Sequence, residues 1–168
     1  NLEVAGRRLE VLLRLAKEKK DIAIIVKQHP AEYHLKKYER FYMKLARKYG
    51  VKITISKDEM QKMLNISDIY TTEFSTTILE AFILKKPIIL TNFERFYKYE
   101  YYPEFKGVIW HSYNYDDFKK AVEDILKNKP GKKEDEFRKK IINGHLYKTD
   151  GKAVKRIIDV ITRLKTRH

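Results

Sequence analysis

Hydroxyl side chains and a carboxylate gather in one stretch of the chain, residues 67–91, in a pattern suited to binding a phosphate. Ser75, Thr76 and Thr77 stand between a short β-rich run and an apolar, helix-like segment, and Glu80 follows inside that segment. The first N–H groups of a helix lack intrahelical partners and carry the positive end of the helix dipole. Hydroxyls at such a position can therefore cap the helix or hold an anion.

This pattern has two interpretations. In the first, Ser75 or Thr76 only caps the helix, and Glu80 is a solvated acid of its first turn. In the second, the hydroxyls and backbone amides bind a diphosphate, while Glu80 accepts hydrogen bonds from ribose hydroxyls. The residues by themselves leave both interpretations open.

A second group of candidate residues follows an unbroken apolar run, residues 22–26. The run predicts a strand buried on both faces of a parallel sheet, and Pro30 stops the strand pattern. Just beyond it, Lys27 offers a point charge and His29 can donate a hydrogen bond to a phosphate. The alternative is a turn with a solvated imidazole ring.

Other chemistries lack the residues that they need. The six glycines form neither a G-x-G-x-x-G nor a G-x-x-x-x-G-K-[ST] motif, which disfavours a dinucleotide dehydrogenase and a P-loop nucleotidase. The absence of cysteine excludes disulfides and thiolate catalysis, and the five histidines are scattered without metal-ligand spacing. We expect no metal ion and no cofactor.

Helical and strand patterns alternate along the chain, without hairpin signals between them. Helices are predicted over residues 2–19, 31–49, 58–64, 78–84, 115–126, 134–142 and 152–164, and strands over residues 22–26, 51–55, 68–72, 87–91 and 108–110. Gly50 is expected to end the second helix, and Ser56 to cap the third. This order predicts an α/β, Rossmann-like parallel sheet with helices on both faces, whose ligands bind at the carboxyl ends of the strands.

The composition favours one basic domain. A length of 168 residues suffices for one well-packed core, and the net charge of +14 favours phosphates, nucleic acid or acidic lipid headgroups as partners. Aromatic and basic residues interleave over residues 92–106, a predicted loop that could stack bases or sugars, contact another domain or a membrane surface, or pack on the protein itself. No apolar run is long enough to span a membrane and no signal peptide is visible, so we expect a soluble, cytoplasmic protein.

Residues 1–168 read as a single Rossmann-like nucleotide-binding domain. The chain starts with Asn1 rather than Met and enters a helical pattern at once. We therefore expect it to be a fragment of a longer, two-domain protein.

Three motifs, in this order, resemble the C-terminal donor-binding domain of GT-B glycosyltransferases. They are K-x-H-P at residues 27–30, S-D-x-x-x-T-x-F-S at residues 67–75 with a later Glu80 and K-P at residues 86–87, and D-G-x-A-x-x-R at residues 150–156. The likeness is greatest to the CDP-glycerol glycerophosphotransferase and capsule-polysaccharide branch.

The resemblance implies a donor-nucleotide-binding domain of a transferase. Such an enzyme moves a glycosyl or glycerophosphoryl group from a CDP- or UDP-linked donor to a cell-surface polymer or glycan acceptor. The acceptor and the catalytic base would belong to an N-terminal domain, so no catalytic residue is assigned here and the isolated domain would be inactive. The net charge would suit that neighbouring domain, a polyanionic acceptor or the inner face of an anionic membrane.

The resemblance also implies roles for single residues. His29 would bind the donor diphosphate, Ser75 and Thr76 would hold phosphate, and Glu80 would meet the ribose. The implied nucleotide-binding set is Lys27, His29, Thr72, Glu73, Ser75, Thr76, Thr77, Glu80, Asp150 and Gly151.

The chain departs from the motif at a few positions, and other functions stay open. Glu73 replaces the usual Asp, Thr76 replaces a second Ser, and the aromatic loop replaces a stretch rich in glycine and proline, which bears on CDP-glycerol specificity. One alternative is a non-enzymatic basic module that binds anionic membrane or, ranked below it, nucleic acid. Another is an enzyme similar to UDP-N-acetylglucosamine 2-epimerase, which shares the Ser-to-Glu spacing of five but has glycines where this chain has none.

Overall fold

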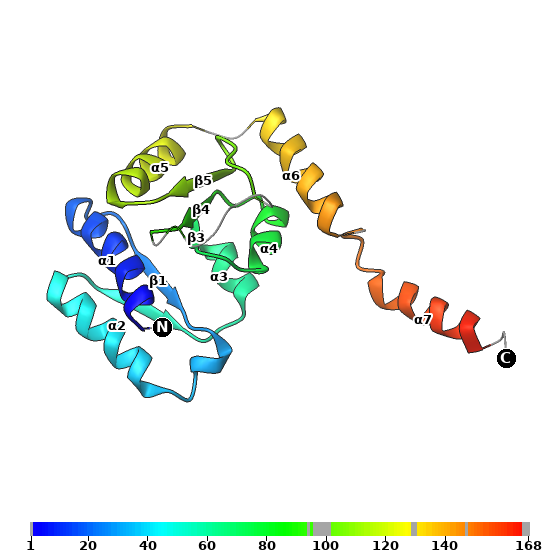
Figure 1. Ribbon diagram of the computed structural model, residues 1–168, viewed down its shortest axis with the longest axis horizontal. Coiled ribbons are helices and arrows are strands. Elements are labelled where there is room, and N and C mark those ends of the chain that lie inside the picture. The colour runs from blue at the N-terminus through cyan, green and yellow to red at the C-terminus, as the bar shows by residue number, and fades with distance from the viewer. Residues whose placement is uncertain (1, 94, 96–101, 129–130, 147, 166–168) are drawn as a thin grey trace.

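Parallel strands and helices alternate in a computed structural model of the 168-residue chain (Figure 1). The structure describes all residues except 1, 94, 96–101, 129–130, 147 and 166–168. In chain order, the elements of the first half are α1 (Leu2–Glu18), β1 (Ile24–Lys27), the short 3-10 helix η1 (Pro30–Glu32), α2 (Lys36–Tyr49), β2 (Ile53–Ser56) and α3 (Met60–Ile66). The second half adds β3 (Tyr70–Thr72), α4 (Thr77–Ile83), β4 (Ile88–Thr91), β5 (Ile109–Ser112), α5 (Tyr115–Lys127), α6 (Lys132–His145) and α7 (Ala153–Lys165).

The first pair of strands, β1 and β2, runs parallel, with Ile24 opposite Ile53. Helices α1 and α2 pack together and bury one apolar cluster against these strands. Its fully buried members are Leu9, Leu13, Ala16, Ile24, Tyr42 and Ala46. Gly50 ends α2 in the left-handed conformation (φ 69°), as the sequence predicts, because a glycine adopts that conformation without steric cost.

The second sheet has the order β3-β4-β5, and all its pairings are parallel. All four residues of β4 are buried, and they face opposite sides alternately, as in any strand. Ile88 and Leu90 pack with Phe82 of α4, whereas Ile89 packs with Phe118 of α5 and with residues of α1. An unbroken apolar strand covered on both faces is typical of a parallel sheet with helices on both sides. The predicted α/β fold is thereby confirmed.

The strands form two hydrogen-bonded sheets in the described residues, rather than one continuous sheet. The parts are joined by packing: Leu12 of α1 and Ile22 contact both the β1–β2 cluster and the cluster around Ile89. Leu13 and Leu15 of α1 belong to these two clusters respectively, so one helix serves both sheets. Helix α1 therefore holds the two halves of the domain together.

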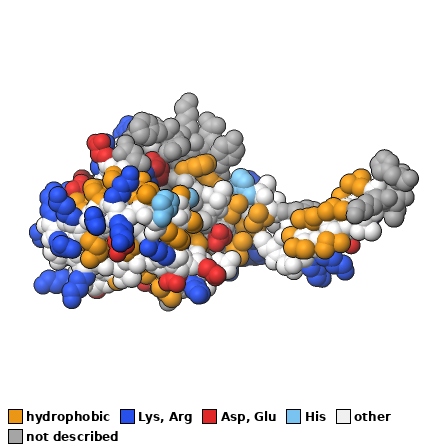
Figure 2. All heavy atoms as spheres, turned by 90° about the horizontal axis from the view of Figure 1, so that it is seen from below, with side chains coloured by type: hydrophobic (Ala, Val, Ile, Leu, Met, Phe, Trp, Pro, Cys, Tyr) orange, Lys and Arg blue, Asp and Glu red, His pale blue; other side chains and the backbone are white. Residues whose placement is uncertain are grey.

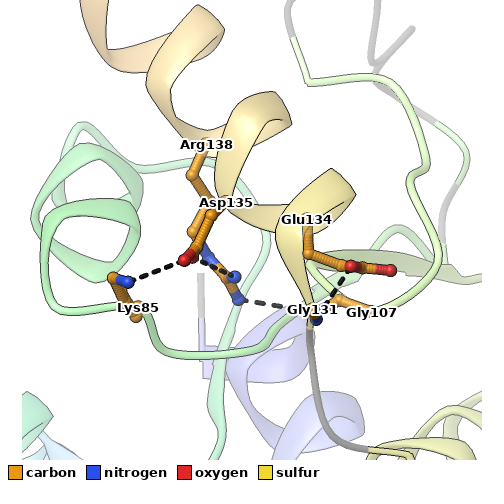
Figure 3. Close-up of polar contacts among 6 residues, drawn as sticks. All are labelled: Lys85, Gly107, Gly131, Glu134, Asp135 and Arg138. Carbon is orange, nitrogen blue, oxygen red and sulfur yellow. Dashed lines mark hydrogen bonds and ion pairs between the residues drawn. The ribbon is translucent and has the colours of Figure 1, made fainter.

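Helix α6 is held against α4 and the segment before β5 by ring stacking and by a cluster of charges, and Figure 3 shows the charged residues. The rings of Phe105 and Phe137 stack with centroids 4.2 Å apart. Lys85 Nζ donates to Asp135 Oδ2 at 2.8 Å, and this contact lowers the pKa of Asp135. The guanidinium of Arg138 is buried; it donates to the carbonyl oxygen of Gly107 at 3.4 Å and lies 3.8 Å from Asp135.

Most predicted elements are present, with boundaries shifted by a few residues. One prediction is wrong: Ser56 does not cap the third helix. Its hydroxyl accepts the N–H of Asp58 and donates to the carboxylate of the same residue, while α3 begins later, after Glu59. Residues 94 and 96–101 of the predicted aromatic loop lie outside the described residues. Within the described ranges, no helix is long and apolar enough to cross a membrane.

Candidate functional site

The turn between β3 and α4 carries the hydroxyl residues singled out in the sequence. Ser75 Oγ accepts the N–H of Thr77 at 3.3 Å and lies 2.7 Å from Thr77 Oγ1, which in turn contacts the hydroxyl of Tyr70. Thr76 occupies the N-cap position, is exposed, and makes no capping bond with its side chain. Ser75 therefore accepts one of the N–H groups at the start of α4, just beyond the carboxyl end of β3, and this contact is compatible with both interpretations of the turn.

Glu73, in the same turn, forms an ion pair with Arg8 of α1. The side chain of Glu73 is 13% exposed and that of Arg8 is 29% exposed. Solvent therefore screens this ion pair less than it screens ion pairs whose two side chains are both largely exposed. Arg8 was not predicted as a site residue, because nothing in the sequence links a helix at residue 8 to a turn at residue 73. The pair fixes the β3–α4 turn against α1.

Lys27, at the end of β1, is held by its neighbours. Its ammonium donates to the carbonyl oxygen of Gln28 at 2.7 Å and to the hydroxyl of Tyr33 at 2.6 Å. Tyr33 donates in turn to the carbonyl oxygen of Lys57, and Lys57 donates to the carbonyl oxygen of Tyr33. The sequence did not single out Tyr33 or Lys57. Together these contacts bring two positive charges to one aromatic ring beside the ends of β1 and β2.

His29 follows β1 and is exposed. Its Nδ1 accepts the N–H of Ala31 at 3.2 Å, at the start of η1. A neutral imidazole that accepts through Nδ1 carries its proton on Nε2. The turn therefore selects the tautomer whose exposed side can donate a hydrogen bond, which is what binding a phosphate oxygen requires.

The two remaining candidates of the central stretch take simpler positions. Thr72 ends β3, and its carbonyl oxygen accepts the hydroxyl of Thr91 at 3.3 Å, across the ladder to β4. Glu80 lies in α4 and is partly buried. The structure adds no contact that assigns Glu80 to a ribose, so that role remains a prediction.

Asp150 and Gly151 lie in the connection between α6 and α7, away from the strand ends (Figure 1). Both carboxylate oxygens of Asp150 accept from Arg156 at 2.9 Å, and one also accepts the N–H of Lys152. These hydrogen bonds lower the pKa of Asp150, that of Lys152 contributing most. Gly151 has a φ of 70°. The D-G-x-A-x-x-R motif thus builds the start of α7, and a contact with the donor remains a prediction.

The candidates therefore fall into three groups. Lys27 and His29 follow β1, the hydroxyl turn follows β3, and Asp150 starts α7. A shallow hollow of about 440 Å³ lies beside β2, lined by Ser56, Lys57 and Asp58 among others, but neither His29 nor Ser75 lines it. Among the described residues, no group of three histidine or acidic side chains is placed to hold a metal ion.

Comparison with families of known proteins matches residues 8–144 to the family described as glycosyl transferases group 1. Comparison with curated proteins and with solved structures gives no match. The matched range begins in α1 and ends in α6, so it includes Lys27, His29 and the hydroxyl turn and stops before Asp150. It spans well over half of the chain and agrees with the resemblance to glycosyltransferases, although it does not separate the CDP-glycerol branch from others. The chain belongs to the glycosyl transferases group 1 family.

Proposed function

We propose that this chain is the donor-nucleotide-binding domain of a transferase that uses a CDP- or UDP-linked donor. The family match over residues 8–144 carries the proposal, because glycosyltransferases of this family use nucleotide-activated donors. The position of the candidate side chains supports it, since ligands of such folds bind at the carboxyl ends of parallel strands. The transferred group is a glycosyl or glycerophosphoryl group, and the acceptor is a cell-surface polymer or glycan.

The chemistry that these residues can supply is stabilisation of the leaving diphosphate. Developing negative charge on the diphosphate would meet the ammonium of Lys27, the Nε2–H of His29 and the amides at the start of α4. Ser75 would orient that first turn while its neighbour Thr76 stays exposed to the ligand. Glu80 would accept hydrogen bonds from the ribose. None of these roles needs a metal ion.

The rest of the enzyme lies on a partner domain in this proposal. An N-terminal domain binds the acceptor and provides the base, and the complete protein works in the cytoplasm, at the inner face of an anionic membrane. The net charge of +14 supports partners of this kind. The isolated chain is then expected to bind a nucleotide without turning a donor over.

Titration calorimetry with CDP, UDP and their glycerol and sugar conjugates tests the proposal. We expect one base series to bind and Ser75→Ala to weaken that binding, with Ser75→Thr restoring part of it. Thr162→Ala, which removes a hydroxyl on α7, serves as the matched control and should bind as the unaltered chain does. Failure of every nucleotide to bind would refute the proposal.

The net charge of +14 also favours a second candidate, a basic module that binds nucleic acid. It predicts affinity for single-stranded oligonucleotide that falls steeply with salt and does not respond to Ser75→Ala. Binding of a mononucleotide that depends on Ser75 and hardly on salt would exclude it.

A further inference from the structure

Arg8 and Glu73 bring opposite charges together at the hydroxyl turn, from positions 65 residues apart in the chain. Glu73 is the first residue after β3, and Ser75 follows it by two positions. Arg8 lies in the first half of α1. The side chain of Glu73 is 13% exposed, so solvent screens its charge only in part. A negative charge is therefore fixed at the place where the proposed donor would bring its diphosphate.

Such a carboxylate opposes the binding of a diphosphate unless another charge compensates it. Two residues of extended chain span about 7 Å at most, so the backbone of Glu73 lies no further than this from that of Ser75. At separations of this order near a protein surface, the repulsion between like charges changes an affinity about tenfold. Arg8 supplies the compensating charge, because a guanidinium stays protonated at any ordinary pH.

Stability alone explains the ion pair poorly. Nη2 of Arg8 donates to Glu73, but its Nε is buried and has no hydrogen-bond partner within the described residues. A buried N–H without a partner costs free energy, and apolar side chains of similar volume often serve a fold as well as a shielded ion pair does. A pair that leaves one donor unpaired is therefore better explained by what its charges do than by packing.

We propose that Arg8 is a charge-compensating residue of the donor site, which neutralises Glu73 so that the hydroxyl turn can accept a diphosphate. Arg8 acts through Glu73 and does not itself touch the donor. The inference deepens the proposed function and rests on it. It adds to the site a residue of α1 that lies outside all three sequence motifs.

The contribution of Arg8 differs from that of the general positive charge of the chain. The net charge is +14, and Figure 2 shows lysine and arginine side chains spread over the body of the domain. Salt screens exposed charges of this kind beyond roughly 8 to 10 Å, so the loss of one of them changes ligand binding little. A large effect of Arg8 must therefore come from its contact with Glu73.

Titration calorimetry of the full 168-residue chain with CMP, CDP, UMP and UDP tests the inference. Arg8→Met should weaken binding of the preferred diphosphate about tenfold and that of its monophosphate less, because the repulsion grows with the charge of the ligand. Glu73→Gln should instead strengthen diphosphate binding about threefold, since it removes a negative charge and keeps Arg8. Arg8→Lys keeps the positive charge and should retain most of the affinity.

Two further variants separate charge from packing. Arg8→Met/Glu73→Gln removes both charges and should bind the diphosphate within about threefold of the unaltered chain. Arg14→Met removes the same positive charge from the same helix, where Arg14 Nε lies 3.7 Å from Glu18 Oε1, and it should bind as the unaltered chain does. Urea unfolding establishes that each variant is folded.

Three results would overturn the inference and leave the proposed function standing. One is equal diphosphate affinity in Arg8→Met and the unaltered chain. Another is weaker binding by Glu73→Gln, which a role in packing alone predicts and which decides the case even if Arg8→Met does not fold. The third is a double variant as weak as Arg8→Met, which would place Arg8 on the donor itself. Failure of the unaltered chain to bind any nucleotide would instead refute the proposed function, and this inference with it.

Discussion

His29 offers the sharpest test of the proposed donor site, because its two ring nitrogens would have different tasks there. Nδ1 accepts the N–H of Ala31 within the turn, whereas Nε2 carries the proton that faces outward. Asparagine places an amide oxygen at the position of Nδ1 and has nothing at the position of Nε2. His29→Asn should therefore keep the turn and remove the donor, while His29→Gln places an amide nitrogen near the position of Nε2.

The size of the effect follows from the kind of hydrogen bond that is lost. A hydrogen bond to a charged group contributes about 1.5–3 kcal/mol, equivalent to roughly 10- to 150-fold in affinity. His29 is exposed, so solvent competes for its partner and the lower end applies. We expect His29→Asn to weaken binding of the preferred nucleoside diphosphate about tenfold in titration calorimetry, and His29→Gln to weaken it less.

Stability measurements complete this test. Urea unfolding should give nearly equal free energies of unfolding for the unaltered chain and for His29→Asn, because the bond to Ala31 is retained. Equal nucleotide affinity in His29→Asn and the unaltered chain would refute the role of Nε2. Equal losses in the asparagine and glutamine variants would refute the argument from the tautomer.

Three further predictions concern the packing that supports the site. Phe82 is 1% exposed behind the hydroxyl turn, so Phe82→Ala should lower the free energy of unfolding by about 3–5 kcal/mol in urea titrations, and a loss below 1 kcal/mol would contradict a packed core there. Arg138 is buried with no hydrogen-bond partner for Nε or Nη1. Replacing it with an apolar side chain of similar length, Arg138→Met, should therefore leave the free energy of unfolding in urea unchanged or raise it by about 1–4 kcal/mol. A decrease as large as the one measured for Arg138→Ala would contradict this prediction. The Lys85 ammonium lowers the pKa of Asp135 in the folded chain. The Asp135 carboxylate therefore stabilises the fold fully at pH values above its unfolded pKa of about 4, and this contribution is lost as the pH falls through its lower, folded pKa. Urea midpoints of Asp135→Asn and the unaltered chain should converge in acid, and a gap that persists below the folded pKa would speak against the ion pair.

The fold could be predicted to the extent that apolar patterns determine it. The run that became β4 is buried at all four positions, and such a run admits few structures other than a strand covered on both faces. The division into two hydrogen-bonded sheets could not be predicted, because it depends on how Leu12 and Ile22 pack between distant elements. The prediction that Ser56 caps the third helix is wrong for a local reason. The hydroxyl of Ser56 accepts the N–H of Asp58, two residues along the chain and ahead of the helix.

The candidate site shows the same division between local and distant information. Turn residues such as Ser75 and His29 could be found because their partners lie within two residues along the chain. Arg8 could not, since its contact with Glu73 spans 65 residues and joins two elements that the sequence does not relate. Sequence patterns identify side chains that organise a turn, and only the folded chain shows what holds that turn in place.

Ser75, His29 and Lys27 already make hydrogen bonds within the chain, and these bonds affect how a donor would bind in the proposed function. Ser75 and His29 are each anchored to a nearby backbone N–H, and Lys27 is fixed by Gln28 and Tyr33. Groups that are already ordered lose little conformational entropy when a ligand arrives, so more of their interaction energy contributes to affinity. The capping interpretation and the phosphate-binding interpretation of Ser75 are therefore compatible, because a hydroxyl that fixes the first turn of α4 also fixes the amides that a diphosphate would meet. On this argument, Ser75→Ala lowers the affinity for the donor by loosening the turn. A Ser75→Ala variant whose turn remains ordered should therefore retain part of that affinity.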